Sequence, residues 1–78
     1  MADKYTRDDL LNHAKSPGWE LVTHDQEPVT GTLEDVAKAA HERHKAGHGI
    51  GLIRRIENAV ELEMLQIEVL WQHLGLPR

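Results

Sequence analysis

A chain of 78 residues and 8.9 kDa has room for one small domain. It contains no cysteine, which excludes disulfides and thiolate sites, and its 40% apolar and 28% charged residues are typical of a soluble globular protein. The longest stretch without a polar side chain, residues 49–53, is far shorter than the ~20 residues of a membrane-spanning helix. The first residues also lack the apolar stretch of a signal peptide. We therefore expect a cytoplasmic protein with a single domain over residues 1–78.

The formal net charge of −4 is distributed unevenly along the chain. Residues 1–36 carry three basic and eight acidic side chains, residues 37–55 five basic and one acidic, and residues 56–78 one basic and four acidic. A cationic segment therefore lies between two anionic ends. We expect these segments to fold against each other or against a second copy of the chain.

The first part of the chain predicts a short helix followed by a loop. Thr6 and Asp9 match the capping-box pattern of a helix start, which favours a helix over residues 7–15. Ser16-Pro17-Gly18 ends it, since the residue before a proline is disfavoured in the α region. Residues 16–32 are expected to be mostly irregular loop, although alternation after Trp19 leaves open a short hairpin against Val29.

A second helix is predicted over residues 33–46. Thr32 and Asp35 repeat the capping pattern, and Leu33, Val36, Ala37 and Ala40 fall on one stripe at helical spacing. Gly47 is expected to end this helix.

The apolar pattern after these glycines predicts a third helix over residues 52–74, ended by Gly75 and Pro77. One stripe of apolar side chains recurs at steps of three and four residues. Its members are Ile53, Ile56, Val60, Met64, Ile67, Trp71 and Leu74. A second apolar group on the opposite side of the helix consists of Leu62, Leu65 and Val69.

Such a helix would extend about 35 Å, more than the diameter of about 30 Å of a compact chain of this length. Two shorter helices cannot cover both of its apolar sides. The sequence therefore predicts an all-α fold: a short helix and an antiparallel helical hairpin with a long C-terminal helix, paired with a second copy as a dimeric helical bundle. Both apolar groups form the predicted interface. A heteromeric helical partner would cover the same surface, and a monomer covered by its own loop is the remaining alternative.

Three histidines form a candidate metal site. His41, His44 and His48 have spacings of three and four, so a continuous helix would project them into one sector, where imidazoles could share Zn²⁺, Ni²⁺ or Cu²⁺. The pattern differs from the HExxH of zinc peptidases, and a helix end at Gly47 would separate His48 from the other two. Surface or interface histidines are therefore the favoured interpretation.

The glycine-rich segment 47–51 is a candidate anion site. Flexible backbone amides here precede a predicted helix start and two guanidinium groups, Arg54 and Arg55. The segment lacks the spacing of a phosphate-binding loop. A structural role, as the turn of a helical hairpin, is the favoured interpretation.

Residues 32–40, TLEDVAKAA, resemble the first helix of a helix-turn-helix domain. The resemblance implies DNA binding, but His41-Glu42-Arg43 stands where such domains place a small residue, and the next segment is glycine-rich and then apolar. Together with the negative net charge, this makes nucleic-acid binding an unfavoured interpretation.

No arrangement of serine or threonine with histidine indicates a nucleophile and its base, so we expect a protein that is not an enzyme. The predicted function is a small regulatory or accessory module acting as a helical homodimer or as a partner-binding subunit, without a cofactor. The alternative is a metal- or anion-binding protein built on the histidines and the segment 47–55.

Overall fold

The computed structural model describes residues 5–77, which form three helices and a three-stranded antiparallel sheet. The elements are α1 (Arg7–Asn12), β1 (Trp19–Val22), β2 (Val29–Gly31), α2 (Leu33–Lys45), β3 (Leu52–Arg55) and α3 (Met64–His73). The strand order is β2-β1-β3, so β1 is central. The predicted all-α fold and helical bundle are therefore wrong.

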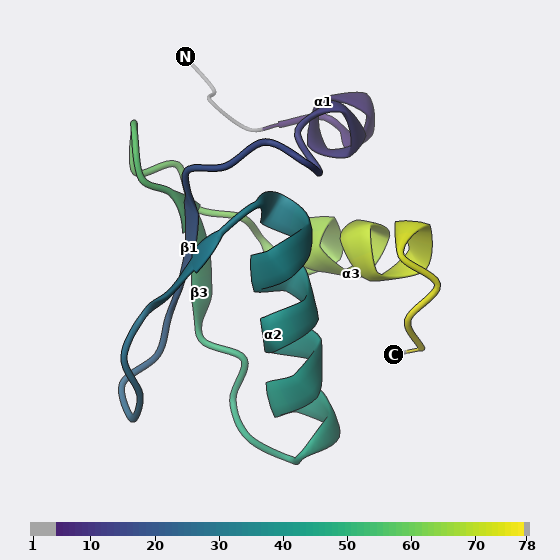
Figure 1. Cartoon of the computed structure of the whole chain (residues 1–78). Helices are drawn as coiled ribbons and strands as arrows, with labels where there is room; N and C mark the ends of the chain where they lie inside the picture. The colour runs from purple at the N-terminus through teal and green to yellow at the C-terminus, as the bar shows by residue number, and fades with distance from the viewer. Residues whose placement is uncertain (1–4, 78) are drawn as a thin grey trace.

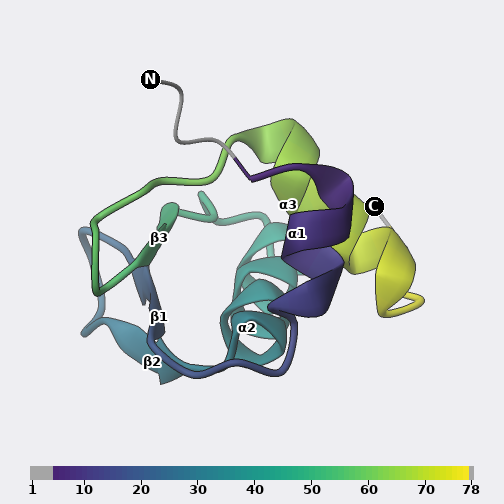
Figure 2. The same cartoon turned by 90° about the horizontal axis from the view of Figure 1, so that it is seen from above.

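The layers follow from the position of α2. The α2 helix covers one face of the sheet. On the side of α2 that faces away from the sheet, α3 packs across α2, and α1 lies alongside α3 (Figures 1 and 2). Within residues 5–77 no helix covers the opposite face of the sheet (Figure 2). The core lies between these layers, around Trp19 and Leu21 of β1, Val36 of α2, Ile53 of β3 and Trp71 of α3, all fully buried.

The two predicted helix starts are confirmed. The Thr6 and Thr32 hydroxyls each accept a hydrogen bond from the backbone N–H three residues on. In return, the carboxylates of Asp9 and Asp35 accept a hydrogen bond from the backbone N–H of these threonines. Each box satisfies backbone donors that the first helical turn leaves free. The first helix is shorter than predicted, because it ends at Asn12 and continues as turns.

The predicted stop at Gly47 is also confirmed. Gly47 has φ +82°, and its N–H bonds to the His44 carbonyl while the His48 N–H bonds to the Arg43 carbonyl, which together form a Schellman motif. Glycine suits this position because left-handed backbone is strained for residues with a Cβ.

The prediction of a mostly irregular loop over residues 16–32 is wrong, and the short hairpin against Val29 that the alternation left open is present as β1 and β2. Trp19, Glu20 and Leu21 pair with Gly31, Thr30 and Val29, while the other edge of β1 pairs with β3. A two-stranded hairpin alone is marginal in water, and the third strand together with α2 stabilises it.

The helix predicted over residues 52–74 is wrong at its first half, and with it the helical hairpin. Leu52–Arg55 is a strand along the whole of β1. The chain then reverses through Ala59, at φ +57°, and returns along the outer edge of β3. There the backbone N–H of Arg55 donates to the Val60 carbonyl, and the backbone N–H of Leu62 donates to the Ile53 carbonyl. Only Met64–His73 is helical. The C-terminal helix has 10 residues, so it is not longer than the molecule and does not need a second copy to cover it.

Candidate functional site

The ten predicted interface residues separate into three groups by exposure. Four lie in the core of the single chain: Ile53, Leu62, Ile67 and Trp71. Three are half-buried: Val60, Val69 and Leu74. Three are exposed: Ile56, Met64 and Leu65.

Trp71 shows why the first group is unavailable to a partner. Its ring is fully buried, and its indole Nε1 donates a hydrogen bond of 2.9 Å to the Ala37 carbonyl of α2. Within α3, two members of the stripe that predicts a dimer interface, Ile67 and Trp71, therefore pack against the protein's own core.

Among the described residues, two of the four large exposed apolar side chains lie at the start of α3, and Val29 of β2 is a third, 38% exposed. Leu65 is 74% exposed and the adjacent Met64 is 41% exposed, whereas Ile56, 52% exposed, lies apart in the turn that follows β3. Single exposed apolar residues are common on soluble proteins, but two in the first turn of one helix form a patch that a partner could cover.

Three glutamates lie near this patch in the sequence, and one of them, Glu61, is the antiparallel bridge partner of Arg54. Glu61 and Glu63 are exposed just before α3, and Glu68 is half-buried one turn after Met64 and Leu65. No lysine or arginine occurs from residue 56 to residue 77. We call Glu61, Glu63, Met64, Leu65 and Glu68 the α3 surface.

The three histidines lie in different surroundings. The buried His41 contacts the Pro77 carbonyl through Nε2 and lies edge-on to the Trp71 ring. Because a carbonyl oxygen only accepts, this contact places a proton on Nε2. His44 lies beside the same Trp71 ring with centroids 5.3 Å apart, and His48 is exposed beyond the end of α2. Over residues 5–77, no group of three or more potential ligands is placed to hold a metal ion.

The two arginines of the candidate anion site are both engaged. On the uncovered sheet face, Arg54 Nε lies 2.5 Å from Glu20 Oε1. On the core side, Arg55 donates to the Tyr5 hydroxyl at 3.0 Å and lies over the Trp19 ring. The hydrogen bond to Tyr5 raises the pKa of Arg55. The strand directs the two guanidinium groups to opposite faces, because successive side chains alternate.

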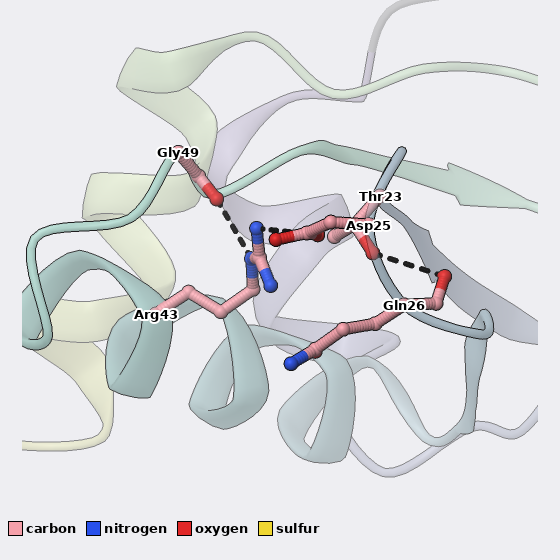
Figure 3. A network of polar contacts seen from close by, with 5 residues as sticks. All are labelled: Thr23, Asp25, Gln26, Arg43 and Gly49. Atoms are coloured by element: carbon pink, nitrogen blue, oxygen red, sulfur yellow. Dashed lines mark hydrogen bonds and ion pairs between the residues drawn. The ribbon is translucent and has the colours of Figure 1, made fainter.

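A polar network that the sequence analysis missed joins two loops beside α2 (Figure 3). The Arg43 side chain is 9% exposed; its Nη2 lies 3.0 Å from Asp25 Oδ1 and its Nε donates to the Gly49 carbonyl at 2.7 Å. Nη1 is buried without a hydrogen-bond partner among the described residues. Helical spacing from the buried Val36 and Ala40 places Arg43 on the core side of α2, a signal that could have predicted its burial. The network ties residues 23–26 to the segment after α2.

Comparisons with protein-family models, with curated proteins and with solved structures find no match for this chain. In the described part of the chain, every helix is too short or too polar to traverse a bilayer.

Proposed function

We propose that this chain is a small, non-enzymatic protein–protein interaction module, which binds a protein partner or a second copy through the α3 surface. The supporting observation is the exposure of Leu65. Covering a leucine side chain contributes about 1.5–3 kcal/mol, and this one lies at the start of a helix whose opposite side is fixed in the core. The cytoplasm remains the compartment in which we expect the module to act.

A rigid frame favours this role. The α3 helix begins with a hydrogen bond of 2.8 Å from the Glu63 amide to the Gln66 side chain. It ends in a Schellman motif in which Gly75 and Leu76 donate to the carbonyls of Gln72 and Trp71. A helix held at both ends and along one side presents Leu65 with little ordering cost on binding.

The metal- or anion-binding alternative is less well supported. His41 is committed to the Pro77 carbonyl, and Arg54 and Arg55 already have Glu20 and Tyr5 as partners. A metal or anion would have to displace these contacts, whereas a protein partner needs only the surface that is already exposed.

Site-specific cross-linking tests the proposal, because a chain without cysteine accepts a single reactive position. A photo-cross-linker is attached to Leu65→Cys and, as the matched control, to Val29→Cys. Val29 is also an exposed apolar residue, but it lies on β2, on the far side of α2 from α3 (Figures 1 and 2). When the labelled, purified protein is added to an extract of cells that normally produce it, adducts of defined mass are expected from position 65 and not from position 29. Equal labelling at both positions, or no adduct at either, would contradict the proposal.

A further inference from the structure

The face of the sheet that no helix of residues 5–77 covers carries a row of side chains with alternating charge. Glu20 lies on this face, because the neighbouring Trp19 and Leu21 of β1 point into the core and successive side chains of a strand alternate. The strand pairings extend the row across the sheet in the order Thr30, Glu20, Arg54 and Glu61. Acidic, basic and acidic side chains therefore follow one another, and we call this side of the sheet the open face.

Apolar side chains lie on both sides of this row. Val22 and Leu52 are the next cross-strand pair on the open face, and both are half-buried. On the other side of the row, Ile56 continues the alternation along β3 and is 52% exposed. Its N–H donates to the Gly18 carbonyl at 2.8 Å, and a Cβ added to Gly18 would have nothing within 4 Å. Ile56 thus lies beside a position with no side chain and open space around it.

Two turns shape the corners of the open face. Because β1 is antiparallel to both of its neighbours, the turn between β1 and β2 and the turn after β3 lie at opposite ends of the sheet and on opposite sides of β1. Both turns lean away from α2, whereas the segments that lead into β1 and β3 bend toward the helices (Figures 1 and 2). The open face therefore has two raised corners on one diagonal and two lowered corners on the other.

A second copy of the chain has the matching pattern. Most closed dimers are twofold, so that the same patch of both copies meets. A twofold axis parallel to the strands, between β1 and β3, sets Glu20 of each copy opposite Arg54 of the other. The same rotation sets Ile56 opposite Gly18 and each raised corner over a lowered one. A partner of uniform charge would instead meet like charge along the row, which opposes association.

We propose that the open face binds a second copy of this chain through this twofold contact, with the two sheets stacked face to face. The pair of Glu20 and Arg54 within each chain is retained, so the contact forms a square of alternating charges. Because three short strands offer little area, the association is weak and reversible.

This dimer goes beyond the proposed function, because it uses the opposite side of the molecule. The α3 helix packs on the side of α2 that faces away from the sheet, so Leu65 of both copies stays exposed (Figures 1 and 2). The pair therefore presents the α3 surface twice, and a partner with two binding sites would be held by both.

An exchange of charge between two copies tests the contact. Arg54→Glu alone sets carboxylates against carboxylates, and Glu20→Arg alone sets guanidinium groups against each other. In sedimentation of the full chain at up to about 1 mM, each variant alone is expected to associate at least about tenfold more weakly than the original chain. An equimolar mixture of the two variants opposes unlike charges across the contact and is expected to regain the dimer. Mixing cannot restore the ion pair within either chain, so recovery reports the contact alone.

A pair of apolar variants localises the contact. Ile56→Gln is expected to weaken the dimer severalfold. The control Val29→Gln is expected to leave it unchanged, because Val29 pairs with the buried Leu21 and so lies on the side of the sheet that faces α2. Both positions are exposed, so a circular dichroism spectrum and urea midpoint like those of the original chain verify folding.

The outcomes separate this inference from the proposed function. An original chain that stays monomeric at about 1 mM, or a mixture of the charge variants that does not associate, overturns the open-face dimer. A dimer that Leu65→Gln dissolves and Arg54→Glu leaves intact also overturns it, and assigns the second copy to the α3 surface. If the charge variants behave as expected but position 65 gives no cross-link in the extract, the dimer stands and the proposed function fails.

Discussion

At the scale of single residues, the helix caps are the features that sequence predicts best. Thr32 and Asp35 are three residues apart in the chain, so the hydrogen bonds between them need only local backbone geometry. The same holds for Thr6 and Asp9, and both helices start where the pattern indicates.

The cap at Thr32 supports a first prediction. Thr32→Ala removes the oxygen that accepts the Asp35 amide and is expected to lower the free energy of unfolding by about 1 kcal/mol. Thr32→Ser retains a hydroxyl and should recover most of the loss. Urea denaturation of the three proteins measures both changes; a serine variant as unstable as the alanine variant would show that the methyl group, not the cap, matters.

The ion pair between Asp25 and Arg43 supports a second prediction, on pH. Desolvation opposes ionisation of Asp25, but the Arg43 guanidinium and hydrogen bonds to the carboxylate outweigh it and lower the pKa of Asp25 below the usual value of an aspartate. A carboxyl whose pKa is lower in the folded chain contributes stability above its unfolded pKa, and loses that contribution as pH falls through the folded value. Asp25→Asn should therefore be less stable than the original chain at neutral pH, and the difference should shrink in acid.

A neighbouring carboxylate serves as the control. Glu27 is exposed on the same loop, so Glu27→Gln tests a similar loss of charge away from Arg43. Urea midpoints are measured from neutral pH to below pH ~4, where carboxyl groups ordinarily titrate. As the pH falls, the midpoint of Asp25→Asn should approach that of the original chain, whereas the difference between Glu27→Gln and the original chain should not change with pH in this way. A difference for Asp25→Asn that stays constant with pH would mean that the pair with Arg43 does not titrate as the structure implies.

At the scale of elements, β3 explains the principal error of the sequence analysis. Ile53 and Ile56 fit a helical stripe with Val60 and Met64, yet the chain forms a strand at Leu52–Arg55 because β1 provides a pairing partner at least 30 residues earlier in the chain. Ile56, a member of the stripe, is 52% exposed, so its place in the pattern was coincidental. Periodicity reports local order, and a pairing made by distant residues leaves no periodic signal in so short a strand.

Two glycines with similar backbone angles give a third prediction. Gly51 has φ +80° and directly precedes β3, where an added Cβ would collide with the Val22 carbonyl and lie 2.8 Å from Thr23 Cγ2. Gly47 has φ +82° and open space around it. Both alanine variants incur the left-handed backbone strain of about 1 kcal/mol. Gly51→Ala should lower the free energy of unfolding more than Gly47→Ala does, because the added Cβ collides with the backbone of Val22 and pushes β3 away from β1.

Urea denaturation compares the two glycine variants directly. Equal decreases in the free energy of unfolding for Gly47→Ala and Gly51→Ala would indicate that β3 can move away from β1 without loss of stability. A larger loss for Gly51→Ala, with reduced hydrogen-exchange protection of the β1 amides, is the expected result.

At the scale of the whole molecule, the candidate site was predicted in part. Leu65 and Met64 were included in a predicted interface and are exposed, but Ile67 and Trp71 of the same set are core residues. Their burial depends on α1 and α2 packing around α3, which spacing along one helix does not show. The Arg43 network was missed for the same reason, because its partners come from two separate loops.

The last prediction separates core from surface on one helix. Ile67 is 3% exposed and Leu65 is 74% exposed, two positions apart in α3. Ile67→Ala is expected to cost about 2–5 kcal/mol, a large part of the roughly 4–12 kcal/mol that 0.05–0.15 kcal/mol per residue implies for this chain. Leu65→Ala should change stability by no more than about 0.5 kcal/mol, because a residue surrounded by water leaves no cavity. Urea denaturation measures both losses, and if the two were equal, Leu65 would belong to the core and the α3 surface could not be a docking site.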